Sequence, residues 1–150
     1  MAIFFDTGVF IGCCVERDAH RDAAGALFLR GCQGEWGAMW TSDLVFAEVL
    51  NFFTCKRVLP QAVSRFLAAT RGSDAARAPV QPVLRASGPT FTRALETYEQ
   101  NIQRRLSFTD CATLVLLESR KIATLATFDG PLAAEARRRG IDVIGLPESP

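Results

Sequence analysis

The stretch IATLATFDGPLAAEARRRGIDVIG, residues 122–145, decides the fold class because a helix-like segment separates two strand-like ones. Residues 122–128 and 141–145 are typical of buried strands, since their apolar residues run on without the alternation of a half-exposed strand. Residues 131–140 between them are typical of a helix. Strand, helix and strand in this order predict parallel strands joined by a crossover helix.

The same alternation continues toward the N-terminus. Predicted strands cover residues 2–5, 37–42 and 82–87, and predicted helices cover residues 8–18, 20–31, 43–53, 60–72, 89–105 and 107–121. Ser42 is a good N-cap, Pro60 suits a first helical turn, and Gly31 is expected to end its helix. We therefore predict a three-layer α/β/α sandwich with a central, mainly parallel sheet, formed as one domain over residues 1–150. The loosest passage is expected at residues 71–90.

Composition narrows the class of protein. A chain of 150 residues is long enough to bury a core without disulfides or structural metals. Hydrophobic residues make up 49% of the chain, yet every apolar run is too short to span a membrane. The N-terminus has no basic region before its short apolar run, which excludes a secretory signal peptide. We expect a cytoplasmic protein that makes no membrane contact.

The cysteines and the charged residues say less about the class of protein than length and hydrophobicity do. The five cysteines form no C-x-x-C pair and His20 is the single histidine, which disfavours zinc and predicts reduced, mostly buried thiols. The net charge of +1 excludes no partner, but lysine occurs only at Lys56 and Lys121. Arginine suits bidentate phosphate contacts, although genome composition gives the same bias. Phosphate recognition therefore stays open on composition alone.

Three aspartates share one predicted location. Asp6 and Asp129 each follow a predicted strand, and Asp110 lies in the first turn of a predicted helix. Because the carboxyl ends of parallel strands lie along one edge, these side chains are expected to meet there. Each also has a plainer explanation, since Asp6 and Asp129 suit helix N-caps, and Ser107 with Asp110 resembles a capping box.

Glu48 is harder to explain as a cap because it lies inside the apolar helix DLVFAEVLNFF, residues 43–53. At helical spacing it shares a stripe with Leu44, Val45 and Phe52, and a carboxylate there needs a partner. A nearby arginine or exposure at a polar edge is one explanation. The other is a cation shared with the aspartates, because clustered carboxylates repel each other and hard ions such as Mg²⁺ or Mn²⁺ prefer oxygen ligands.

At these residues the chain resembles PIN-domain nucleases, in particular the VapC-like toxins of toxin–antitoxin modules. The resemblance rests on FFDTGVFI at the start, TSDLVFAEVLN around Glu48, LSFTDCATL around Asp110 and LATFDGPL around Asp129. It implies a Mg²⁺- or Mn²⁺-dependent endoribonuclease whose acidic and metal-binding site is Asp6, Glu48, Asp110 and Asp129, supported by Thr7 and Thr127. Gly8 and Leu132 depart from the family's usual residues without removing a metal ligand.

The resemblance also implies partners: an RNA substrate, a cognate antitoxin protein and a second copy of the chain in a homodimer. Arginines at the rim are expected to hold RNA phosphates, and the candidates are Arg104, Arg105, Arg137, Arg138 and Arg139. Solvated helix ends explain these arginines equally well.

Two other functions compete with cleavage. The chain could be an interaction module with little catalysis, using an apolar groove at Phe52, Phe53, Leu59 and Phe66 for a partner helix. Aspartyl-phosphate chemistry at Asp6 is disfavoured, because haloacid-dehalogenase-like phosphatases need a second aspartate two positions later and Gly8 stands there.

Overall fold

The protein is described by a computed structural model over residues 1–72 and 78–146. Five strands form one sheet in the order β3-β2-β1-β4-β5, and each pair of neighbours is parallel. This confirms the predicted fold class. The strands are β1 (Ala2–Phe5), β2 (Ala38–Ser42), β3 (Val80–Leu84), β4 (Thr124–Ala126) and β5 (Asp142–Ile144).

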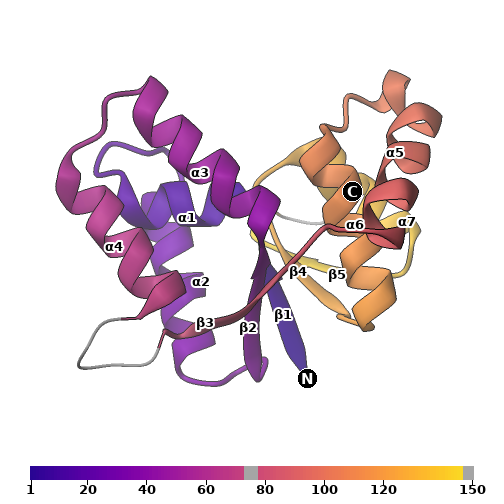
Figure 1. The fold of residues 1–150 in the computed structure, drawn as a ribbon. Helices are drawn as coiled ribbons and strands as arrows, with labels where there is room; N and C mark the ends of the chain where they lie inside the picture. Colours follow the sequence, from indigo (N-terminus) through magenta and orange to yellow (C-terminus); the bar gives the residue numbers. More distant parts are fainter. Residues whose placement is uncertain (73–77, 147–150) are drawn as a thin grey trace.

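Helices cover the sheet on both sides (Figure 1). One side carries α1 (Thr7–Cys14), α2 (Arg21–Cys32), α3 (Asp43–Cys55) and α4 (Pro60–Arg71). The other side carries α5 (Pro89–Gln100), the 3₁₀ helix η1 (Ile102–Arg104), α6 (Phe108–Arg120) and α7 (Gly130–Arg138). The central strand β1 is fully buried at Ile3, Phe4 and Phe5, as a strand between two helical layers must be.

Two helices end elsewhere than the sequence predicts. The helix expected over residues 8–18 stops at Cys14, where the chain turns so that α2 can pack on α1. That packing is close: a Cβ added at Gly12 would lie 2.6 Å from Ala24 Cβ. The second helix, α2, runs one residue past Gly31 to Cys32, and Gly31 is buried against Met39, where a Cβ would lie 2.9 Å from Met39 Cε.

The helix expected over residues 89–105 is interrupted at Asn101. The side-chain amide of Asn101 donates to the Thr97 carbonyl at 2.7 Å, which satisfies a carbonyl at the end of α5. The chain then forms η1 and passes through Arg105 in the left-handed region, with φ of 59°. Of the passage expected to be loose, residues 73–77 lie outside the described residues, and β3 occupies residues 80–84.

Apolar side chains of α1, α3 and α4 form an aromatic cluster rather than an open groove. Phe66 is fully buried and its ring packs against Phe10 at 5.2 Å and Phe53 at 6.0 Å between centroids. The expected partner groove is therefore wrong for Phe53 and Phe66, because both are needed to join the three helices.

The cysteines are free, as expected. Cys14 and Cys111 are buried, whereas Cys32 and Cys55 are exposed, so the expectation of mostly buried thiols is wrong for these two. Within residues 1–72 and 78–146, no helix combines the length and apolar character needed to cross a membrane.

Candidate active site

Asp6 lies where the central strand β1 meets α1. Its N–H donates to the Ala126 carbonyl at 3.1 Å, which continues the pairing of β1 with β4 by one residue. The Asp6 side chain is buried, and its Oδ2 accepts a hydrogen bond from the Thr127 hydroxyl at 2.8 Å. Asp6 is the N-cap of α1 by position, but its carboxylate makes no capping bond. The plainer explanation for this aspartate is therefore wrong.

Asp129 follows β4 and begins α7. Its Oδ1 accepts from the Leu132 N–H at 2.7 Å, so this aspartate is a helix cap. Its own N–H donates to Thr127 Oγ1 at 3.0 Å. Because the same Thr127 hydroxyl donates to Asp6, one side chain links the two aspartates across the neighbouring strands.

Glu48 reaches the same edge from α3, which begins directly after β2. Ser42 caps this helix by accepting from the Val45 N–H at 3.2 Å. The buried stripe of α3 is Val45, Val49 and Phe53, and the half-buried Glu48 lies beside it. Glu48 Oε2 accepts a hydrogen bond from the hydroxyl of Thr7. Glu48 thus meets a hydroxyl on α1, not an arginine.

Asp110 lies in the first turn of α6 and forms the predicted capping box. Its Oδ2 accepts from the Ser107 N–H at 2.6 Å, while its own N–H donates to Ser107 Oγ at 3.1 Å. The capping role of this aspartate is therefore real. The hydrogen bond from the Ser107 N–H occupies one oxygen of the Asp110 carboxylate and fixes this side chain at the N-terminus of α6.

The four acids line one pocket of about 500 Å³, although each comes from a different segment of the chain. The other residues of its wall include Thr7, Gly8 and Ile11 of α1, Phe52 of α3, and His20, Arg105, Ser107 and Phe128. The parallel sheet explains this meeting, since it brings the ends of β1, β2 and β4 to one edge.

The electrostatics show that these carboxylates influence one another. Burial raises the pKa of Asp6 to about 7, against the Thr127 hydrogen bond that lowers it, and the charges of Asp110 and Glu48 raise it further. Burial also raises the pKa of Asp110 to about 6, with added contributions from Asp129 and Glu48. Carboxylates with raised pKa values in a pocket are typical of functional sites.

The chemistry of the donor set fits a hard cation, because the pocket offers carboxylate and hydroxyl oxygens without a thiol. Among residues 1–72 and 78–146, however, no three histidine, cysteine, aspartate or glutamate side chains already converge as metal ligands do. Each of the four carboxylates instead has a protein donor. Each of these bonds engages one oxygen of its carboxylate, and the second oxygen is the one that a cation would use.

Two aromatic side chains of the wall were not predicted from the sequence. The rings of His20 and Phe128 stack with centroids 4.3 Å apart and planes inclined by 3°. Phe128 also packs on the first turn of α1, where a Cβ added at Gly8 would lie 3.7 Å from Phe128 Cδ2. The position of Phe128, between a strand and Asp129, was a signal for this wall; the distant partner His20 had none.

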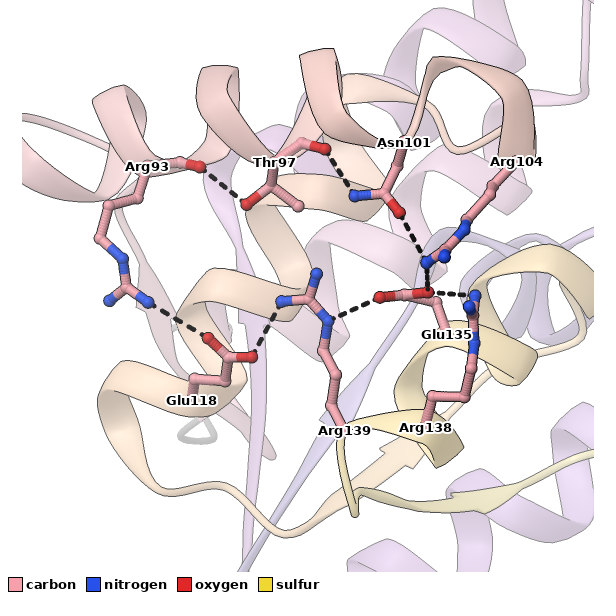
Figure 2. A network of polar contacts seen from close by, with 8 residues as sticks. All are labelled: Arg93, Thr97, Asn101, Arg104, Glu118, Glu135, Arg138 and Arg139. Atoms are coloured by element: carbon pink, nitrogen blue, oxygen red, sulfur yellow. Dashed lines mark hydrogen bonds and ion pairs between the residues drawn. The ribbon is translucent and has the colours of Figure 1, made fainter.

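The five arginines proposed for RNA contacts lie in different surroundings. Arg105 lines the acid pocket. Arg104, Arg138 and Arg139 instead pair with the buried Glu135, and Figure 2 shows their side chains converging on it. Arg139 also pairs with Glu118 at 2.8 Å, which in turn pairs with Arg93. Arg137 donates to the Leu146 carbonyl at 3.1 Å.

Glu135 therefore joins α7 to η1, and Arg139 extends the network to Glu118 of α6. Burial acts to raise the pKa of Glu135, but the hydrogen bond from Arg139 and the charges of Arg139, Arg138 and Arg104 outweigh it and lower the pKa. This pairing was not predicted from the sequence, although Arg138 and Arg139 follow Glu135 by three and four residues, the spacing at which side chains of one helix meet. RNA contact by Arg104, Arg138 and Arg139 stays a prediction. In the structure their ion pairs attach η1, which directly precedes Arg105, to α7.

Comparison with known proteins agrees with this fold. A VapC ribonuclease of Archaeoglobus fulgidus is 24% identical over 127 residues, covering 84% of this chain and 76% of its own. The crystal structure of Mycobacterium tuberculosis VapC20, described as a sarcin-ricin loop cleaving toxin, has the same fold, with a TM-score of 0.73 at 22% identity over 89% of this chain and 94% of its own.

A second solved structure, PAE2754 from Pyrobaculum aerophilum, matches with a TM-score of 0.57 at 17% identity, covering 96% of this chain and 92% of its own. The family described as PIN domain matches residues 3–138, a span that includes all four acids and both supporting threonines. On that match, the chain belongs to the PIN domain family.

Proposed function

We propose that this protein is a Mg²⁺- or Mn²⁺-dependent endoribonuclease, acting as one nuclease domain over residues 1–150. The observation that carries the proposal is the meeting of Asp6, Glu48, Asp110 and Asp129 in one pocket. Family membership and the VapC ribonuclease of Archaeoglobus fulgidus favour RNA as the substrate class. By the same likeness we propose that it is the cytoplasmic toxin of a toxin–antitoxin pair.

Asp6, Glu48, Asp110 and Asp129 would hold the cation between them. When bound, Mg²⁺ or Mn²⁺ would offset the charge on the phosphodiester and on its leaving oxygen. The Thr127 hydroxyl donates to Asp6 Oδ2 and holds this carboxylate at the wall of the pocket. One of the four carboxylates would accept the proton of the attacking water as a general base.

Other residues of the wall would position the RNA. The exposed ring of His20, stacked on Phe128, offers a flat surface for a nucleobase beside the acids. Arg105 is the arginine of the wall and would contact a phosphate next to the one that is cleaved. Both contacts orient the substrate without taking part in bond cleavage.

The homodimer is proposed from an exposed apolar stripe on α5 and η1. Phe91, Leu95, Tyr98 and Ile102 follow each other at helical spacing and are 40% to 62% exposed. Side chains of this size gathered on one surface are typical of an interaction site. The stripe lies on the helices that cover the side of the sheet opposite α1–α4.

The test is to incubate total RNA with the purified protein and Mg²⁺ and to map the ends produced. We expect a few defined cuts that disappear with EDTA and with Asp6→Asn. An interaction module with little catalysis is the competing function. It predicts no metal-dependent cuts from a folded protein, together with capture of a partner protein, and that result would replace the nuclease proposal.

A further inference from the structure

A second pocket, larger than the acid pocket, has a strongly cationic wall. It measures about 720 Å³ and lies where the end of α1 meets the turn between α3 and α4. Its charged residues are Arg17, Lys56, Arg57, Arg65 and a single acid, Glu16. Four cations facing one carboxylate give this pocket a positive potential, which favours an anionic ligand.

The four cations are available to a ligand. All of them are exposed, and within residues 1–72 and 78–146 none forms an ion pair or a side-chain hydrogen bond with the protein. This differs from Arg104, Arg138 and Arg139, which already pair with Glu135. Exposed lysine and arginine side chains with free donors are the groups that hold phosphates in nucleic-acid complexes.

The cationic pocket continues the acid pocket along the same pair of helices. On α1, Ile11 lines the acid pocket and Cys14, almost one turn later, lines the cationic one. On α3, Phe52 lines the acid pocket, and Lys56 follows it by four residues at the C-cap and lines the cationic one. The two pockets therefore follow one another in the same direction on two helices that pack together.

The spacing suits a nucleic-acid strand. From Thr7 in the acid pocket to Cys14 in the cationic one, α1 advances about 10 Å, at about 1.5 Å per residue. A stacked strand advances about 3.4 Å per nucleotide, so about three nucleotides cover this distance. If the cleaved phosphate lies among the acids, phosphates about three nucleotides further along the strand would thus lie near Lys56 and Arg65.

We propose that this pocket binds backbone phosphates of the RNA about three nucleotides away from the cleaved bond. The proposal rests on the proposed ribonuclease function and adds to it a second binding site. The acid pocket repels a polyanion, and a cationic pocket at a fixed distance offsets that repulsion and sets the direction of the strand. An acidic protein segment is also negatively charged and could occupy the same pocket. The experiment below distinguishes RNA from such a segment.

The experiment measures binding in EDTA, so that no RNA is cleaved, by fluorescence anisotropy with single-stranded RNAs of three and ten nucleotides. The pocket variant is Lys56→Gln with Arg65→Gln. The matched control is Arg120→Gln with Lys121→Gln, which also removes one arginine and one lysine from exposed positions. Thermal unfolding of each variant verifies that the fold is kept.

We expect wild-type protein to bind the ten-nucleotide RNA more tightly than the three-nucleotide RNA. In the pocket variant the affinity for the longer RNA should fall about ten-fold. The slope of log affinity against log salt should fall by about 1.4, at about 0.7 for each phosphate that the variant no longer binds. The control variant should bind the longer RNA as the wild type does.

Wild-type affinity of the pocket variant for the ten-nucleotide RNA would overturn the proposal. If the same variant also failed to bind labelled poly-L-glutamate that the wild type binds, the pocket would belong to an acidic protein partner instead. Because binding is measured without cleavage, this test is independent of the nuclease proposal. If the pocket variant bound RNA more weakly but the wild-type protein cleaved no RNA, the nuclease function would be refuted and the phosphate-binding pocket would stand.

Discussion

The hydroxyl of Thr127 donates to Asp6 at 2.8 Å and accepts from the N–H of Asp129 at 3.0 Å. One side chain at the end of β4 thereby fixes two of the four acids, and it also lowers the pKa of Asp6 against the effect of burial. Residues that orient ligating groups in this way typically affect activity or metal affinity by about 10–100-fold.

Thr127→Val should therefore lower the rate of RNA cleavage at neutral pH by about 10–100-fold. The substitution leaves Asp6 Oδ2 without its donor, so the pKa of Asp6 rises further. Thr127→Ser keeps the hydroxyl and should retain most of the activity. Cleavage rates and Mn²⁺ affinity by calorimetry test this, and a Thr127→Val protein equal to wild type in both would contradict it.

Stability in EDTA should fall as the pH rises through neutrality. The pKa of Asp6 is raised from 3.8 to about 7, so the folded protein keeps a proton that the unfolded chain has released. Stability is then fully present below the unfolded pKa and is lost as the pH rises through the folded one. Urea unfolding at about pH 5 and about pH 8 measures the change.

Asp6→Asn is the matched variant for this pH dependence. It cannot ionise, so its free energy of unfolding should change less between the two pH values and should exceed that of wild type at about pH 8. A pH dependence equal in both proteins would mean that Asp6 is not the group responsible.

Glu135→Gln should destabilise the fold because it leaves three guanidinium groups beside an uncharged amide. Removing one partner of a fully buried pair costs about 3–5 kcal/mol. The arginines here are 22% to 51% exposed, so we expect about 2 kcal/mol, or about 4–8 °C in Tm. Glu96→Gln on exposed α5 should leave Tm unchanged. An equal Tm for Glu135→Gln and wild type would refute a structural role for this network.

The apolar stripe on α5 predicts a dimer that one charge disrupts. Leu95→Glu places a carboxylate in the middle of the proposed interface and should give a monomer in sedimentation velocity. Leu29→Glu on α2 is the matched control, since Leu29 is 58% exposed on the other side of the sheet, and it should stay dimeric. A monomeric wild type, or a dimeric Leu95→Glu protein, would rule out this interface.

The sequence predicted the features that depend on local pattern. Uninterrupted apolar strands predicted the parallel sheet, and Ser42 and Ser107 predicted where α3 and α6 begin. The meeting of Asp6 and Asp129 followed from the geometry of parallel strands.

Features that depend on distant contacts were missed. Gly31 lies against Met39 of β2, and nothing near Gly31 in the sequence indicates that contact. The break at Asn101 involves Arg104, whose partner Glu135 lies 31 residues later. The stack of His20 on Phe128 likewise joins two segments that only the sheet brings together.

The central claim is that the acid pocket cleaves RNA with a divalent cation, and Asp110→Asn tests it most directly. Asparagine can still accept from the Ser107 N–H, so the capping box and the fold should be kept. The measurement is the cleavage rate of a 5′-labelled RNA across a Mn²⁺ titration, with exposed Asp142→Asn as the matched control. We predict no cleavage by Asp110→Asn at any Mn²⁺ concentration and wild-type cleavage by Asp142→Asn. Cleavage by folded Asp110→Asn at the wild-type rate would contradict the claim.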